Sequence, residues 1–291
     1  MFPGQGSQYI GMGKEFYEQI PICKEVYDLA SEVTGLDIPA LCFEENEKIN
    51  ITEYTQICML ATEAAIYMAL EQNGYQPDVT AGLSLGEYGA LIASGVMTAE
   101  EAFELVRKRG IFMQEAVPAG GAMAAVLGLD AAAIEQICRE TAEQTGSEVS
   151  IANYNCPGQI VISGDAAAVD KAGELAKAAG AKRVLPLKVS GPFHTSLMAP
   201  AGDALREKFK SVDFHDMEIP VLFNCLGREM GEGDTIRRLA DLGVDTVVEI
   251  GPGKALSGFV RKTAKQIKCY PVETAQELQA AVAALKGESD T

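Results

Sequence analysis

A G-x-S-x-G pattern at Gly82–Gly86 restricts the fold of this chain more than any other feature. Residues 77–81 before it are typical of a short strand, and residues 85–94 after it are typical of a helix. A serine in such a turn is strained, and its Oγ is exposed beside the N–H groups of the first helical turn. The pattern predicts a nucleophile, Ser84, next to an anion site. A turn of small residues that serves only packing is the alternative.

A serine nucleophile needs a base, and the chain contains two histidines, His194 and His215. His215 lies in a polar stretch before Pro220, which is typical of a solvated loop. His194 lies in a Gly-Pro turn after an apolar run, a place where residues held at the end of a strand are often functional. His194 is therefore the candidate base, and a histidine packed under a turn is the alternative.

Six motifs spread over almost the whole chain resemble those of the malonyl-CoA:acyl carrier protein transacylases, in the same order. They lie at residues 2–8, 82–87, 109–113, 153–159, 191–194 and 249–253 (FPGQGSQ, GLSLGE, RGIFM, NYNCPGQ, GPFH and EIGPG). The resemblance implies an acyltransferase of fatty acid synthesis. Such an enzyme moves a malonyl group from malonyl-CoA to the phosphopantetheine thiol of acyl carrier protein through a malonyl-serine. Malonyl-CoA is then a substrate, and neither a permanently bound cofactor nor a metal is expected.

The resemblance also implies roles for single residues. The backbone N–H groups of Gln8 and Leu85 would form the oxyanion hole, and His194 would exchange the proton of Ser84 with the leaving thiol. The family's usual G-H-S-x-G has leucine here at position 83, which removes a polar flank but leaves the nucleophile and its oxyanion donor in place.

Arg109 is the residue that indicates an acyl group with a free carboxylate as the substrate. A run of charges such as residues 107–109 usually forms a solvated face of a helix. The resemblance implies instead that Arg109 points inward and binds the malonyl carboxylate through two hydrogen bonds. Phe193 would narrow the pocket against a branched methylmalonyl group. Gln56 and Asn155 match pocket positions, with local hydrogen bonding as an equally good alternative for each.

Two other glycine-rich stretches do not fit nucleotide-binding motifs. The turn at Gly4 has Tyr9 where G-x-G-x-x-G needs glycine, and little chain precedes it to form a first strand. Residues 251–254 read GPGK, but Val248 stands where a P-loop begins and Ala255 follows the lysine. Neither stretch predicts a nucleotide site.

Composition agrees with a cytoplasmic enzyme, and we expect a monomer, although nothing in the sequence determines the oligomeric state. The seven cysteines show no C-x-x-C spacing and read as reduced thiols, and no apolar run approaches a membrane span. A formal charge of −17 argues against nucleic acid or an anionic membrane as a partner. Acyl carrier proteins are acidic as well, so a local basic patch is expected, and its candidates are Lys182, Arg183, Lys188, Lys254, Arg261 and Lys262.

The order of predicted elements indicates an α/β fold in two parts. Residues 1–118 and 191–291 would form a large α/β-hydrolase-like subdomain that carries the nucleophile turn. Between them, residues 119–190 show the order β-α-β-β-α-β of a small ferredoxin-like subdomain. The active site is expected in the cleft between the two.

Two other functions stay open, a serine esterase or thioesterase and a non-catalytic subunit that binds a carrier protein. The resembling family also has about twenty more residues after the position of Asn224, and their backbone normally orients the histidine. We therefore expect residues to be missing between Thr235 and Ile236, with a wide gap there, and a few before Met1.

Overall fold

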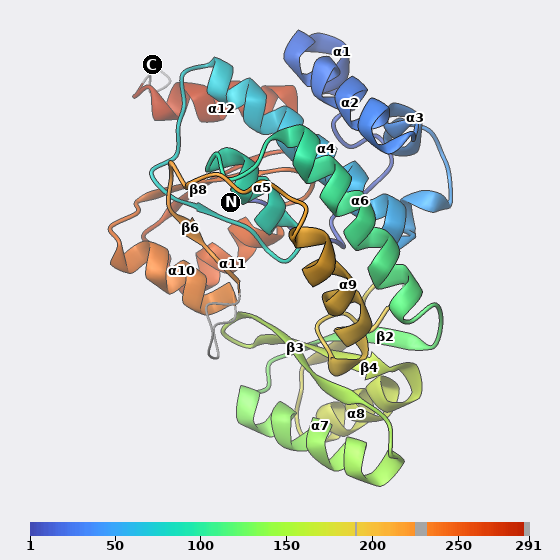
Figure 1. The fold of residues 1–291 in the computed structure, drawn as a ribbon. Coiled ribbons are helices and arrows are strands. Elements are labelled where there is room, and N and C mark those ends of the chain that lie inside the picture. The colour runs from blue at the N-terminus through green and yellow to red at the C-terminus, as the bar shows by residue number, and fades with distance from the viewer. Residues whose placement is uncertain (190, 225–231, 288–291) are drawn as a thin grey trace.

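The computed structural model describes residues 1–189, 191–224 and 232–287, arranged in a larger and a smaller lobe (Figure 1). The larger lobe contains both ends of the described chain. The chain enters the smaller lobe after α6 (Ala99–Ala116) and returns to the larger lobe before α9 (Ala199–Phe209).

The sheet of the larger lobe consists of short parallel strands. One pair is β1 with β6 and the other is β7 with β8, over Thr80–Ala81, Val221–Leu222, Thr246–Ile250 and Lys268–Val272. Met1 and Phe2 lie between the pairs, because the Phe2 N–H donates to Ala81 O at 3.0 Å and the Ile250 N–H donates to Met1 O at 2.8 Å. The start of the chain thus joins the two pairs into one parallel layer.

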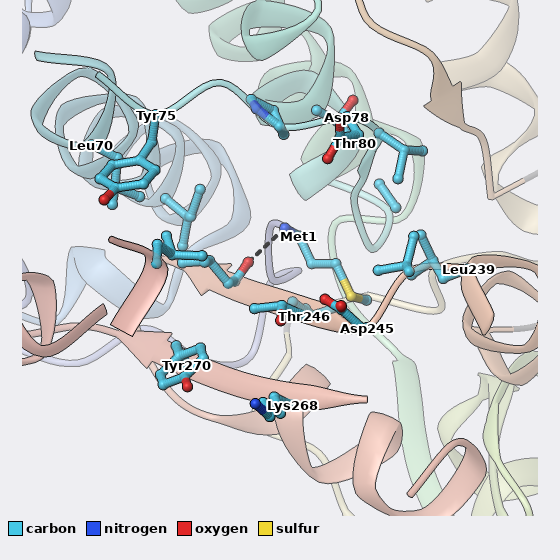
Figure 2. Close-up of a pocket in the computed structure, with 18 of the residues that line it drawn as sticks. Met1, Leu70, Tyr75, Asp78, Thr80, Leu239, Asp245, Thr246, Lys268 and Tyr270 are labelled. Carbon is cyan, nitrogen blue, oxygen red and sulfur yellow. Dashed lines mark hydrogen bonds between the residues drawn. The ribbon is translucent and has the colours of Figure 1, made fainter. Parts of the chain in front are cut away.

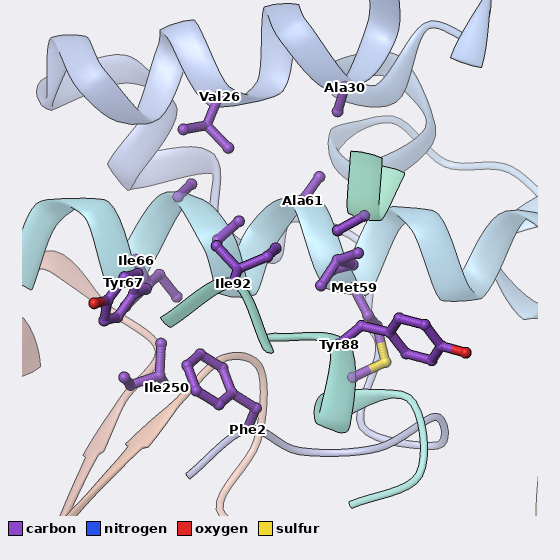
Figure 3. Packing of buried hydrophobic residues seen from close by; sticks show 14 of the residues in the cluster. Phe2, Val26, Ala30, Met59, Ala61, Ile66, Tyr67, Tyr88, Ile92 and Ile250 are labelled. Carbon is purple, nitrogen blue, oxygen red and sulfur yellow. The ribbon is translucent and has the colours of Figure 1, made fainter. Parts of the chain in front are cut away.

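Helices cover this layer. They are α1 (Lys14–Gln19), α2 (Pro21–Thr34), α3 (Ile38–Phe43), α4 (Thr52–Gln72), α5 (Gly86–Ala93), α6 (Ala99–Ala116), α9 (Ala199–Phe209), α10 (Glu232–Asp241), α11 (Ala255–Thr263) and α12 (Ala275–Leu285), with two single turns, η1 (Lys48–Asn50) and η2 (Ser196–Met198). Helix α4 is buried on nearly all sides, as expected for a helix that is apolar all round. Figure 3 shows it between α2 and the layer that contains Phe2 and Ile250.

The smaller lobe is a four-stranded antiparallel sheet with two helices. Its strands are β2 (Gly121–Leu127), β3 (Val149–Cys156), β4 (Gln159–Asp165) and β5 (Arg183–Pro186), in the order β3-β4-β2-β5, and its helices are α7 (Ala131–Thr145) and α8 (Ala166–Ala178). Strands of the first β-α-β unit thus flank a strand of the second, the ferredoxin-like arrangement. The predicted α/β fold class is confirmed, and the subdomain boundaries remain our prediction.

Some predicted elements differ in extent. Residues 14–34 form two helices, because Ile20 is extended (φ −122°, ψ 110°) and Pro21 starts α2. The strand predicted at 77–81 shrinks to β1. The expected wide gap after Thr235 is also wrong, since Thr235 and Ile236 are consecutive residues of α10.

None of the described helices is long and apolar enough to cross a membrane. Six cysteines are free thiols, five of them buried, and Cys225 lies outside the described residues.

Candidate active site

Ser84 lies in the turn between β1 and α5 with φ 50°, a left-handed conformation that is rare for a residue with a side chain. The flanking glycines leave the space that this turn needs. A Cβ on Gly82 would come within 2.1 Å of the Gly86 backbone, and a Cβ on Gly86 would come within 2.2 Å of Phe2 O. The turn therefore has the strained strand-to-helix geometry that the pattern predicts.

The Gly4–Gln8 loop passes against this turn, because a Cβ on Gly4 would meet Leu83 O at 2.8 Å. Within the loop, the Gly6 N–H donates to Gln8 Oε1 at 2.8 Å, and Gln8 Nε2 donates to Asn50 Oδ1 at 3.2 Å. Among the described residues, no atom accepts a hydrogen bond from the backbone N–H of Gln8 or of Leu85. Both donors are free to stabilise an oxyanion.

Arg109 points inward from α6 and is 9% exposed. Its Nη2 donates to Ser84 Oγ at 3.2 Å, its Nη1 donates to Gln56 Oε1, and its guanidinium lies 5.6 Å from the centre of the Tyr88 ring. The neighbouring Lys108 is exposed, so the charge run at 107–109 divides between the two sides of the helix. A buried guanidinium 3.2 Å from Ser84 Oγ can bind an anionic group at this position.

Gln56 is fully buried and bridges Arg109 to the seam between the lobes, since its Nε2 donates to Met113 Sδ at 3.3 Å. Met113 belongs to a cluster of buried residues that also contains Phe193, Met123, Ala125, Val161 and Ala201. Phe193 is therefore a packing residue of the seam, and any effect on pocket width acts through this cluster.

His194 follows Phe193 and has φ 62°, the second left-handed residue other than glycine in the described chain. The residue as a whole is exposed, although many protein atoms lie near its imidazole and displace water from it. This desolvation, with repulsion from Arg109 as the smaller cause, lowers the pKa of His194 to about 4. The imidazole is therefore neutral at pH 7 and able to accept a proton. No described residue accepts a hydrogen bond from it.

Asn155, on β3, is buried, and its Oδ1 has no hydrogen-bond partner in the part of the chain that the structure describes. Among the described residues no hydrogen bond joins Asn155 to Ser84 or Arg109. The structure thus brings Ser84, Arg109 and Gln56 together by hydrogen bonds, with His194 close enough to Arg109 to feel its charge, and leaves Asn155 apart.

Two contacts of the site escaped the sequence reasoning. Asn224 bonds the Ser84 turn from 140 positions away, and the Tyr88 ring lies beside the Arg109 guanidinium. Tyr88 lies just after the motif on the first turn of α5, so the sequence could have indicated that its side chain lies near Ser84. Asn224 offered none, since its partner is distant in sequence.

A cavity of about 620 Å³ lies away from this site. Figure 2 shows Met1, Thr80, Thr246, Lys268 and other residues around it. These residues lie at the amino ends of the parallel strands, whereas Ser84 follows the carboxyl end of β1. In parallel sheets ligands bind beyond the carboxyl ends, so this cavity lies on the opposite side from the chemistry.

Comparison with known proteins gives consistent matches over most of the chain. The acyl transferase domain family matches residues 1–235. The malonyl CoA-acyl carrier protein transacylase of Bacillus subtilis (strain 168) is 45% identical, over 100% of this chain and 98% of the relative. That alignment has 310 positions against 291 residues here, so at least 19 positions have no residue of this chain.

Solved structures agree with these relatives. The crystal structure of MCAT from Streptococcus pneumoniae is 46% identical, with a TM-score of 0.90 over 97% of this chain and 98% of that one. A malonyl-transacylase in complex with its holo type II PKS acyl-carrier protein is 37% identical, with a TM-score of 0.93 over the same shares of the two chains.

Proposed function

Since this chain belongs to the acyl transferase family of malonyl-CoA:acyl carrier protein transacylases, we propose that Ser84, His194 and Arg109 carry out its malonyl transfer, as a step of fatty acid synthesis. The chain transfers malonyl groups from malonyl-CoA to acyl carrier protein. The roles of Gln8, Leu85 and Arg109 are those that the family resemblance implies, and the contacts of Ser84 and Arg109 support them.

In the first half-reaction Ser84 Oγ attacks the thioester carbonyl carbon while neutral His194 takes the hydroxyl proton. The N–H groups of Gln8 and Leu85 stabilise the oxyanion of the tetrahedral intermediate. The C–S bond then breaks, and His194 returns the proton to the sulfur of coenzyme A. A malonyl-serine ester remains on Ser84.

In the second half-reaction the phosphopantetheine thiol of the carrier gives its proton to His194 and attacks the same ester carbonyl. The bond from carbon to Ser84 Oγ breaks, and His194 protonates the serine. The thioester on the carrier is the product, and the enzyme returns to its starting state with no net change in protons.

The observation that carries this proposal is the pairing of a strained Ser84 with the buried guanidinium of Arg109, 3.2 Å from its Oγ. An esterase of simple substrates does not need a buried cation beside its nucleophile, and a binding subunit needs neither group. A carboxylate one methylene away from the reacting carbonyl fits this short separation.

An intact mass measurement after mixing with malonyl-CoA tests the proposal. We expect one malonyl adduct per chain, its location at Ser84 shown by peptide mapping, and no adduct on Ser84→Ala. Full labelling of Ser84→Ala, or no labelling of the native chain at short times, would rule the proposal out. Hydrolysis of simple esters faster than transfer to a carrier thiol would instead indicate an esterase.

A further inference from the structure

The carboxamide of Asn224 bonds three groups of the turn that carries the nucleophile. Its Oδ1 accepts from the Ser84 N–H at 3.1 Å, and its Nδ2 donates to Gly82 O and, at 3.1 Å, to Glu87 Oε2. These partners lie before, at and after the nucleophile. One side chain therefore ties together the end of the strand, the turn and the first turn of α5.

The register of the sheet explains why Asn224 reaches this turn. Strands β1 and β6 run parallel with Thr80 opposite Val221 and Ala81 opposite Leu222. Asn224 comes two residues after β6, so continuing the register places it opposite Leu83, directly before Ser84. The contact follows from strand pairing and does not depend on a chance loop conformation.

The turn needs such support because Ser84 is left-handed. A residue with a Cβ holds this conformation only where its surroundings over-determine it. Relaxation of Ser84 would rotate the peptide between Ser84 and Leu85, and the N–H of Leu85 is the free donor of the oxyanion hole. The Ser84 N–H already donates to Asn224 Oδ1. Of the N–H groups of Ser84 and Leu85, only that of Leu85 is therefore available to the oxyanion.

We propose that Asn224 is a positioning residue of the transfer reaction, which holds the Ser84 Oγ and the Leu85 N–H in their reactive arrangement through its three hydrogen bonds. This inference rests on the proposed role of Ser84. Among the described residues no hydrogen bond joins Asn224 to Arg109, so its proposed role concerns the nucleophile and not the malonyl carboxylate.

The test uses Asn224→Leu, which removes all three hydrogen bonds at similar volume, and Asn224→Asp, which keeps an oxygen for the Ser84 N–H but loses both donors and faces the Glu87 carboxylate. Rapid-quench measurement of Ser84 acylation gives kcat and KM for malonyl-CoA. We expect the leucine variant to lose on the order of 10- to 100-fold in kcat with KM within about twofold, and the aspartate variant to lose kcat as well, because two of the three hydrogen bonds are gone.

Asn73→Leu is the matched control, because its Nδ2 also donates to a backbone carbonyl, Ala69 O at 2.7 Å, but at the end of α4 away from the site. It should keep native kcat. Thermal unfolding of every variant gives its folded fraction, and the measured rates are corrected for that fraction. If the leucine variant does not fold, the test rests on the kcat of the aspartate variant.

The inference is overturned if both Asn224 variants keep kcat within about twofold, or if KM rises as much as kcat falls. Absence of acylation in the native chain would instead overturn the proposed role of Ser84, so the two failures are distinguishable.

Discussion

The Nη2 of Arg109 donates a hydrogen bond to Ser84 Oγ at 3.2 Å, so the proposed carboxylate-binding group and the nucleophile are in direct contact. Gln56 holds the other terminal nitrogen of the same guanidinium. When a malonyl group binds, its carboxylate becomes a stronger acceptor for Nη2 than a hydroxyl. Substrate binding would then release Ser84 Oγ for proton transfer to His194.

Replacing Arg109 with alanine should weaken malonyl transfer by about 2 kcal/mol or more, the scale of a charge-assisted contact. Acetyl transfer should rise relative to malonyl transfer, because an acetyl group leaves the native guanidinium without its anion. Competition between malonyl-CoA and acetyl-CoA measures the ratio. Lys108→Ala, on the exposed side of α6, is the control and should leave it unchanged. An unaltered ratio in the Arg109 variant would contradict the assigned role.

The base should stay neutral far into the acidic range. The pKa of His194 is lowered to about 4 from 6.5, first by desolvation and second by Arg109. NMR titration of the ring should give a midpoint near 4, and the signal is assigned by its loss in His194→Ala. Arg109→Gln should raise the midpoint without restoring 6.5, since the larger cause remains. A midpoint near 6.5 in the native chain would refute the desolvated site.

The same lowered pKa has a consequence for stability. Between pH 6.5 and 4 the unfolded chain binds a proton at His194 that the folded chain does not, so the free energy of unfolding should fall as the pH is lowered through this window. Chemical denaturation of native chain and His194→Ala across these pH values measures the difference, and the variant should lose less stability. Parallel curves would contradict this linkage.

Carrier docking should depend on exposed basic residues near the seam. Arg261 and Lys262 end α11, and Lys262 Nζ reaches Gln159 Oε1 on β4 at 3.3 Å, while Lys254 is paired with Glu273 and Glu277 and so is a weak candidate. Reversing Arg261 and Lys262 to glutamate should slow carrier-dependent transfer roughly tenfold at low salt and less at high salt.

Acylation of Ser84 by malonyl-CoA should stay nearly intact in this double variant. The matched control replaces Lys14 and Lys24 with glutamate, which changes the net charge by the same amount. These residues lie on α1 and α2, at the end of the molecule away from the smaller lobe (Figure 1). An equal loss in both half-reactions would show a structural role for Arg261 and Lys262.

Local patterns were enough to predict the elements that carry the chemistry. Helix α5 follows the Gly82–Gly86 pattern as expected, and the start of α6 is set by a local capping box at Thr98 and Glu101. The left-handed Ser84 follows from the two glycines that flank it at close range. These features depend on neighbours within a few residues, which is the range over which a sequence pattern acts.

Tertiary structure alone decided how the site is assembled. The inward direction of Arg109, the buried acceptor Gln56, and the hold of Asn224 on Ser84 join residues 53 and 140 positions apart. The lowered pKa of His194 likewise arises from atoms of other segments that crowd its ring. A sequence states which chemical groups are present, but hydrogen bonding and desolvation depend on distances that only the packed chain sets.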